Sequence, residues 1–174
     1  MRADLISAAD LLPKARSYPV VGFACTSASS VIGSDKVEEL VRRGCHATAV
    51  TDPLRAAVER LKTLGISNIA LLSPYIEEVN EPLRSAFAAN SVSTDVFGTF
   101  GEAREAKVAR ISISSIVEAA SELGRASEVE GVFISCTNLR TYAAIPDIEA
   151  RIGKPVISSN LALAWHMKML NEKK

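Results

Sequence analysis

The stretch VFISCTN (residues 132–138) ends an apolar, β-branched run with Cys136, a threonine and a small polar residue. The stretch VGFACTS (residues 21–27) has the same order, with Cys25 in the place of Cys136, 111 residues earlier in the chain. A buried strand that delivers a cysteine and a hydroxyl at its end is therefore used twice. The repeat predicts two similar half-structures, and halves that face each other would bring both thiols to one cleft.

Short apolar runs alternate with amphipathic segments along the whole chain. This alternation is typical of βαβ units, so we expect an α/β fold with a mostly parallel sheet. The predicted strands are residues 20–25, 46–50, 69–73, 92–97, 131–136 and 156–158. The predicted helices are residues 5–15, 35–43, 53–64, 77–89, 115–123, 147–152 and 161–170.

Residue types that favour helix ends occur at several of these boundaries. Polar N-caps, a proline at the first helical position and glycines just past a helix are the usual signals. They are Asp52 with Pro53, Ser115 with Glu118, and Asn160 at predicted helix starts, and Gly44 and Gly65 at predicted helix ends.

The composition argues against several classes of function. Lys plus Arg and Asp plus Glu each number 20 in the 174 residues and no basic run occurs, so nucleic acid is not an expected partner. The apolar runs fall far short of the roughly 20 residues that cross a bilayer, and the N-terminus does not resemble a secretory signal. We therefore expect a cytoplasmic protein that binds neither nucleic acid nor membrane.

The cysteine and histidine spacings argue against a metal site. Three cysteines and two histidines occur without CxxC or HxxxH spacing, so we expect free thiols in a reducing compartment and no bound metal. Neither a P-loop nor GxGxxG is present, so a nucleotide cofactor is not expected. The nucleophile elbow GxSxG of serine hydrolases is also absent.

A cysteine at the carboxyl end of a parallel strand lies where α/β sheets gather their ligands. Backbone N–H groups at the start of the next segment favour a thiolate there and can also donate hydrogen bonds to a substrate carboxylate. Two thiols on opposite sides of a substrate carbon support proton exchange, which inverts a stereocentre without a cofactor. Alternatively, one thiolate adds to an activated double bond, so that rotation and elimination convert cis to trans.

Packing is the alternative role for each of these cysteines. Free cysteine is commonly buried, and a single cysteine at a strand end would more often only pack against its neighbours. The matched contexts favour chemistry at Cys25 and Cys136, because packing gives no reason for polar residues to follow each thiol. Cys45 lacks that context and is interpreted as structural, and neither His46 nor His166 is assigned a catalytic task.

Five blocks of sequence together resemble the Asp/Glu racemase superfamily, and within it the branch of maleate cis-trans isomerases and arylmalonate decarboxylases. The resemblance covers nearly the whole chain. The blocks are FACTSASSVIG around Cys25, ALLSPYIEEVN around Tyr75, VARIS at residues 108–112, FISCTNLRT around Cys136 and GKPVISSNLALAWHM near the C-terminus.

The resemblance implies two pseudo-symmetric Rossmann-like lobes with mostly parallel sheets, which enclose the substrate and contribute one cysteine each. We place the first lobe at residues 1–52 with 156–174, and the second at residues 53–155. The family uses no cofactor and commonly forms dimers or tetramers, so a homo-oligomer is expected.

The resemblance also implies roles for individual residues. In the isomerase branch Cys25 would be the nucleophile that adds to the double bond, Cys136 would handle the proton, and Tyr75 would hydrogen-bond the substrate. Four further residues would line two small carboxylate pockets: Thr26, Ser27, Thr137 and Asn138. The expected function is thus a cofactor-independent isomerase of a small carboxylate or dicarboxylate, of the maleate isomerase type.

Three differences within the family bear on this expectation. Relatives begin with a strand and an asparagine-bearing loop that have no counterpart before Met1, so the first lobe is expected to lack that strand, and a catalytically incomplete carboxylate-binding fragment is one alternative. The segment EAREAKVAR places Glu105 where the isomerases usually carry a substrate-binding asparagine. A carboxylate at this position would repel a dicarboxylate substrate. An amino-acid racemase is therefore the other alternative. The decarboxylases replace the first cysteine by glycine, so decarboxylation is not the expected reaction.

Overall fold

A computed structural model describes residues 2–172 and shows two parallel β-sheets. The larger sheet has the strand order β4-β3-β5-β6, and every neighbouring pair in it is parallel. Its strands are β3 (Asn68–Ser73), β4 (Ser93–Thr99), β5 (Gly131–Ile134) and β6 (Val156–Ser158). Because β3 and β5 are neighbours whose connecting segments run in opposite directions, the sheet reverses its order between them.

The core of the larger sheet lies on both of its faces, as in other parallel sheets. On one face Ala70 and Leu72 pack with α7 (Ile113–Gly124) and α8 (Ile145–Ile152). On the other face Leu71 and Phe133 pack with α4 (Pro53–Leu64), α5 (Glu77–Ala88) and α9 (Ser159–Glu172). Successive residues of β3 therefore point to opposite faces, and neither face of this strand meets solvent.

The smaller sheet pairs β1 (Tyr18–Gly22) with β2 (Ala47–Thr51). Its core is formed with α1 (Arg2–Asp10), α2 (Thr26–Ile32) and α3 (Ser34–Gly44). In α3 the buried residues Val37, Leu40 and Val41 recur at the spacing of one helix face. From the same helix Arg42 donates to the backbone oxygens of Ala47 and Thr48, at 2.6 and 2.8 Å, and so ties α3 to β2.

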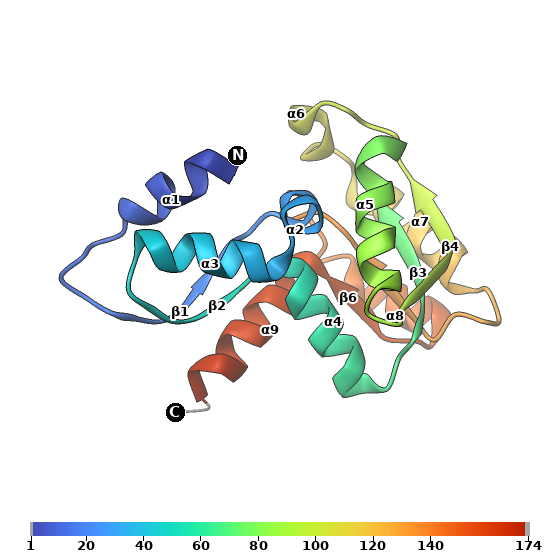
Figure 1. Cartoon of the computed structure of the whole chain (residues 1–174). Coiled ribbons are helices and arrows are strands. Elements are labelled where there is room, and N and C mark those ends of the chain that lie inside the picture. Colours follow the sequence, from blue (N-terminus) through green and yellow to red (C-terminus); the bar gives the residue numbers. More distant parts are fainter. Residues whose placement is uncertain (1, 173–174) are drawn as a thin grey trace.

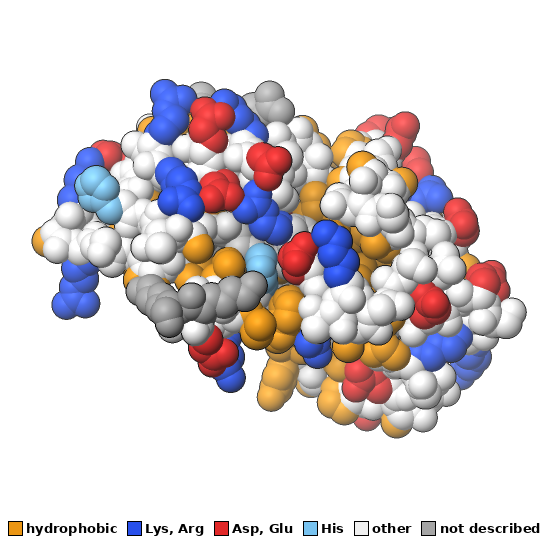
Figure 2. All heavy atoms as spheres, turned by 60° about the horizontal axis from the view of Figure 1, so that its bottom comes forward, with side chains coloured by type: hydrophobic (Ala, Val, Ile, Leu, Met, Phe, Trp, Pro, Cys, Tyr) orange, Lys and Arg blue, Asp and Glu red, His pale blue; other side chains and the backbone are white. Residues whose placement is uncertain are grey.

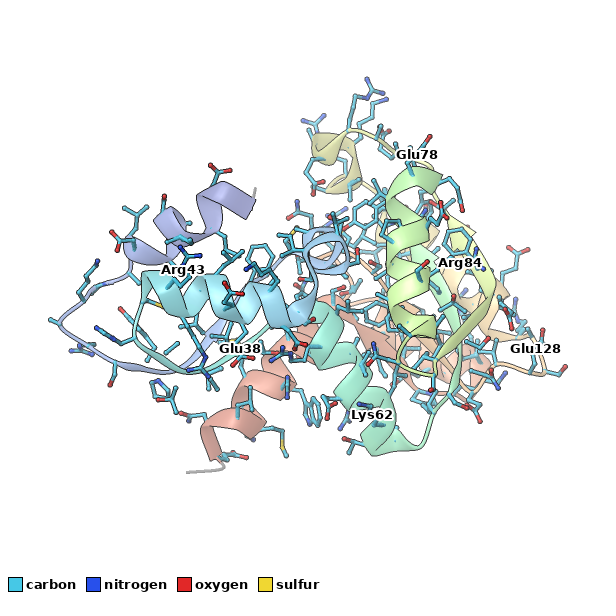
Figure 3. All side chains as sticks on the ribbon, in the orientation of Figure 1. Glu38, Arg43, Lys62, Glu78, Arg84 and Glu128 are labelled. Carbon is cyan, nitrogen blue, oxygen red and sulfur yellow. The ribbon has the colours of Figure 1, made fainter. Side chains whose placement is uncertain are left out.

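Helices α2, α4 and α9 lie between the two sheets (Figure 1). Helix α2 contacts α3, α4 and α5, and α9 contacts β1, β2, β6 and α4. Arg55 near the start of α4 pairs with Asp35 at 2.7 Å and with Glu38 at 2.5 Å, and Figure 3 shows Glu38 on the side of α3 that faces α4. These three helices connect the half of the molecule that carries β1 to the half that carries β5.

All six predicted strands are confirmed, with ends that differ by at most three residues and with β6 matched at both ends. The helix-end predictions at Asp52, Pro53, Gly44 and Gly65 are also confirmed: Asp52 Oδ1 accepts from Leu54 N and Arg55 N at 3.0 and 3.1 Å, and Gly65 ends α4 with φ 69°. Helix α2 and the short α6 (Glu105–Val108) were not predicted, because neither is long enough for a helical apolar period to be visible.

Two other capping predictions are wrong. Helix α7 begins one turn earlier than expected, because the side chain of Ser112 accepts the backbone N–H of Ser115 at 3.0 Å. Asn160 does not cap α9 and instead donates to the backbone oxygen of Thr137 at 3.0 Å, while Ser158 Oγ accepts the backbone N–H of Leu161 at 3.3 Å.

Residues 156–172, predicted as part of the first lobe with 173 and 174, lie against both sheets. Strand β6 pairs with β5 in the larger sheet, with Val156 opposite Val132, and so belongs with the half that carries Cys136. The smaller sheet is reached by α9, which contacts both β1 and β2. Residues 1, 173 and 174 of the predicted first lobe lie outside the described residues.

The surface mixes both signs of charge. Figure 2 shows acidic and basic side chains interspersed over the face that it turns forward, without a large patch of either sign. Within residues 2–172, no helix combines the length and the apolar composition that crossing a membrane requires.

We predict that Gly44→Ala loosens α1 from α3. A Cβ at Gly44 would collide with the backbone oxygen of Ile6 and lie 2.9 Å from the backbone N of Asp10, and backbone atoms of a packed helix cannot swing aside. The expected loss of unfolding free energy is about 1–3 kcal/mol, with faster amide hydrogen exchange in α1. Gly98→Ala is the control, since its Cβ would meet Leu123 Cδ1, the end of a flexible side chain, at 2.7 Å. Equal losses in the two variants would contradict this account.

Candidate active site

The carboxyl ends of β3 and β5 form the point where the larger sheet reverses its strand order. Open α/β sheets bind their ligands at such a point, because the connecting segments diverge there and leave a crevice. Tyr75 follows β3 by two residues, and Cys136 follows β5 by two residues. The fold therefore puts a phenol and a thiol at the place where chemistry is expected.

Cys136 is buried, with 3% of its surface exposed, and its backbone has φ 94°. A non-glycine residue at positive φ is strained, and such strain collects at functional sites. The backbone N–H of Cys136 donates to Ser159 Oγ at 3.1 Å, and its Sγ accepts the backbone N–H of Asn138 at 3.3 Å. The turn after β5 thus folds back over its own sulfur atom.

Cys25 lies at the N-cap of α2 and is half-buried. Its backbone is extended, with φ −141°, and its side chain makes no capping hydrogen bond. The Sγ atom lies 3.7 Å from Ser27 Oγ, and the hydroxyl of Ser29 donates to the Cys25 carbonyl at 2.6 Å. The thiol therefore lies at the start of a helix and makes no strong hydrogen bond.

Tyr75 connects the two cysteine loops. The pKa of its phenol responds to Cys136, Ser27 and Cys25, so the side chain lies near residues of both loops. Burial raises the pKa of Tyr75 above its ordinary value, and the neighbouring Cys136 and Cys25 act in the same direction. The phenol consequently stays protonated at neutral pH and acts as a hydrogen-bond donor.

Hydrogen bonds hold the backbone of Tyr75 in place. Its N–H donates to Ser73 Oγ at 3.1 Å. Its carbonyl accepts from Asn80 Nδ2 at 2.8 Å and from the hydroxyl of Thr99. The side chain therefore reaches the cysteines from a rigid turn.

Ser159, the first residue of α9, joins the two cysteine loops through one oxygen atom. The Thr26 hydroxyl donates to Ser159 Oγ at 2.8 Å, and the Cys136 N–H donates to the same atom at 3.1 Å. Thr26 and Ser159 are 1% and 0% exposed, so both bonds are shielded from water. The Thr137 hydroxyl adds a bond to the Ala24 carbonyl at 3.0 Å.

A carboxylate lies beside Cys136. Asn138 Nδ2 donates to Glu105 Oε1, which places Glu105 next to the turn that follows β5. Burial raises the pKa of Cys136, and the charge of Glu105 raises it further, whereas the Tyr75 hydroxyl and the N–H groups of Asn138 and Leu139 oppose the shift. The net direction of the pKa shift is upward, so Cys136 is a thiol at neutral pH.

The structure brings the predicted site residues into one connected group. Cys25, Ser27, Tyr75 and Cys136 are linked by side-chain contacts, and Asn138 contacts Cys136. Thr26 and Thr137 lie in the same group, with their hydroxyls directed at Ser159 and Ala24. The roles predicted for these seven residues are taken up as proposals below.

Other residues considered from the sequence lie outside this group. Cys45 Sγ donates to the Val41 carbonyl at 3.5 Å, and His166 Nδ1 lies 2.8 Å from Thr51 Oγ1. Across the described part of the chain, no cluster of three His, Cys, Asp or Glu side chains could hold a metal ion.

Sequence reasoning missed Ser159 and Asn160, which hold the Cys136 loop. The available signal was their position: like the two cysteines, they lie within three residues of a strand's carboxyl end, and they carry short polar side chains.

Comparison with known proteins finds enzymes that are similar to this chain in sequence and fold. A family model described as arylmalonate decarboxylase matches residues 3–174. Arylmalonate decarboxylase from Bordetella bronchiseptica is 32% identical over 111 residues, which are 63% of this chain and 46% of that protein. Maleate isomerase from Pseudomonas putida KT2440 is 23% identical over 159 residues, 85% of this chain and 62% of that protein. The matched regions span less than two thirds of either relative.

Solved structures share the fold over almost the whole chain. A liganded double mutant of arylmalonate decarboxylase matches with a TM-score of 0.88 and 27% identity, covering 98% of this chain and 73% of that one. A Nocardia farcinica maleate cis-trans isomerase mutant with a covalently bound succinylcysteine intermediate matches with a TM-score of 0.83 and 22% identity, covering 98% and 71%. The second likeness concerns the fold alone.

We predict that Ser159→Ala destabilises the protein by about 1–3 kcal/mol, because the Thr26 hydroxyl and the Cys136 N–H both lose their acceptor inside the protein. Chemical denaturation measures the loss. Ser121→Ala is the control: Ser121 is also buried, but its hydroxyl has no hydrogen-bond partner among residues 2–172, so its removal should cost nothing. A Ser159 variant as stable as the Ser121 variant would show that the shared oxygen is unimportant.

We further predict that Glu105→Gln lowers the pH at which Cys136 becomes reactive. The Glu105 charge raises the pKa of Cys136, so its removal lets the thiolate form at lower pH. The rate of Cys136 alkylation by iodoacetamide, followed against pH by mass spectrometry, measures the midpoint. Glu118→Gln removes the same charge from an exposed position on α7 and should leave the midpoint unchanged. An unchanged or raised midpoint in Glu105→Gln would exclude the electrostatic effect.

Proposed function

Since the chain belongs to the arylmalonate decarboxylase family, in the Asp/Glu racemase superfamily, we propose that it is a cofactor-independent isomerase of the maleate cis-trans type, acting on a small carboxylate. One observation carries the proposal. Both Cys136 and Cys25 affect the pKa of the Tyr75 phenol, which supports a single site shared by two thiols that follow strands of different sheets.

The proposed reaction begins with addition of the Cys25 thiolate to one carbon of a cis double bond. A C–S bond forms, the π electron pair moves to the neighbouring carbon, and that carbon takes the proton of the Cys136 thiol. The former double bond is now single and rotates. The Cys136 thiolate then removes the same proton, the double bond re-forms in the trans geometry, and the C–S bond breaks to release Cys25. No group is oxidised or reduced, and both cysteines return to their starting states.

The protonation states favour this division of labour. The raised pKa of Cys136 supports its role as proton donor, and its contacts with Tyr75 and Asn138 limit the cost of the thiolate that forms after donation. Cys25 is the more exposed thiol and lies against a serine hydroxyl, which suits the nucleophile. The covalent succinylcysteine of the Nocardia farcinica isomerase, on the same fold, supports covalent addition as the first step.

The neutral polar residues divide into two groups in this proposal. The hydroxyls of Thr26 and Thr137 are used in contacts between the loops, so we assign them to positioning the two cysteines. Tyr75, Ser27 and Asn138 remain as the groups that contact the substrate. Tyr75 donates to the carbonyl group whose charge increases when the thiolate adds.

Decarboxylation is a second candidate, because the matched family model and the relative with 32% identity are arylmalonate decarboxylases. Loss of carbon dioxide from a malonate leaves a carbanion that needs one proton, and Cys136 is placed to supply it. Cys25 distinguishes the two reactions, since isomerisation requires a nucleophile and decarboxylation does not.

We predict that Cys25→Gly and Cys136→Ala each lower cis-trans turnover at least about a thousandfold, because each removes a group that makes or breaks a bond. Proton NMR of maleate and of its monoamide, maleamate, follows the reaction. Cys45→Ala removes the third free thiol, which lies outside the site, and should retain wild-type turnover.

Phenylmalonate in the same variants tests decarboxylation. Carbon dioxide release that survives Cys25→Gly and disappears in Cys136→Ala would favour the decarboxylase over the isomerase. Turnover of maleate and maleamate that survives either cysteine variant would refute the two-thiol mechanism.

A further inference from the structure

The side chain of Asn138, in the turn after Cys136, directs its NH2 group at Glu105. An ionised carboxylate only accepts hydrogen bonds, so Asn138 must present its NH2 group to Glu105. The amide oxygen of Asn138 then faces away from Glu105, and on this exposed side chain it accepts no hydrogen bond from residues 2–172. Glu105 thereby fixes which end of the Asn138 amide is available for another molecule.

The charge of Glu105 is not neutralised by a neighbour. Arg104 and Lys107, which flank it in sequence, both pair with Glu102, at 3.3 and 3.8 Å. No Lys or Arg of the described chain forms an ion pair with Glu105, and its recorded contact is the neutral amide of Asn138. A negative charge therefore stands uncompensated beside Cys136, where it acts on the thiol.

The position of Glu105 is set by the core. It opens α6, and the other end of that helix is Val108, which is 1% exposed and packs in the cluster that contains Leu72 and Cys136. The backbone N–H of Val108 also donates to the Arg104 carbonyl at 3.1 Å. The carboxylate is thus held near Cys136 by a buried anchor three residues away.

The two ends of the site differ in hydrogen-bonding character. Ser27 supplies a hydroxyl near Cys25, and this hydroxyl can donate to a carboxylate. Glu105 and the free oxygen of Asn138 supply acceptors near Cys136. A molecule that spans the two thiols would meet a donor at one end and acceptors at the other.

We propose that Glu105, with the Asn138 amide that it orients, selects substrates with one carboxylate and a hydrogen-bond donor, an amide or an ammonium group, at the opposite end. A second carboxylate at that end would face both the Glu105 charge and the amide oxygen of Asn138. The inference rests on the proposed function for the location of the substrate between the thiols, and it narrows the substrate class from carboxylates in general to carboxylates with a donor group.

Maleate and maleamate test the proposal as a matched pair. The two molecules have the same cis-alkene skeleton, and they differ in that one carboxylate of maleate is a neutral, donating amide in maleamate. Binding is measured by calorimetry in a Cys25→Ala background, so that slow turnover does not disturb the titration. Three proteins are compared in that background: the otherwise unchanged chain, Glu105→Gln and Glu118→Gln.

We expect the unchanged chain to bind maleamate at least about tenfold more tightly than maleate, the size expected for one like-charge contact near the protein surface. Glu105→Gln removes the charge at constant shape and should abolish most of that ratio, mainly by tightening maleate. Glu118→Gln, which removes a charge from the exposed face of α7, should keep the full ratio.

The outcomes separate this inference from the proposed function. A ratio near one in the unchanged chain, an equal ratio in Glu105→Gln, or binding of neither ligand would overturn the selectivity assigned to Glu105. The isomerase proposal is judged separately, by whether turnover in the chain with both cysteines depends on Cys25 and Cys136.

Discussion

The site depends on one shared hydrogen-bond acceptor, the hydroxyl oxygen of Ser159. Strands β1 and β5 belong to different sheets, and backbone pairing does not fix one sheet relative to the other. Ser159 compensates for this because Thr26, next to Cys25, and the N–H of Cys136 donate to the same buried atom. The first residue of α9 thereby relates two cysteines that are 111 positions apart in sequence.

The pKa of Cys136 is set by opposing effects of its surroundings. Burial disfavours a thiolate, and the Glu105 charge acts in the same direction, while Tyr75 and the turn N–H groups favour it. Because donors are already in place, the sulfur can give up its proton and regain it without rearrangement of the surroundings. Preorganisation of this kind is what a proton-transfer group requires.

The sequence was sufficient for the strands and for the two cysteines. Runs such as residues 69–73 are apolar on both sides, and the Cys-Thr repeat occurs in the printed letters. Helix α2 has seven residues and α6 has four, too few for periodicity to identify them. The position of Ser159 after a strand was visible in the sequence, but its link to both cysteine loops was not, because two donors distant in sequence leave no pattern in the spacing of residues.

The positive φ of Cys136 lowers the stability cost of replacing this cysteine by glycine. At φ 94° a cysteine carries conformational strain of about 1–3 kcal/mol, from which a glycine would be free. That relief offsets much of what the buried side chain contributes to stability, so replacement by glycine would leave the fold nearly as robust as before. Cys25, with its extended φ of −141°, offers no such relief. Engineering for thermal tolerance alone would therefore tend to erase the proposed proton donor and keep the proposed nucleophile.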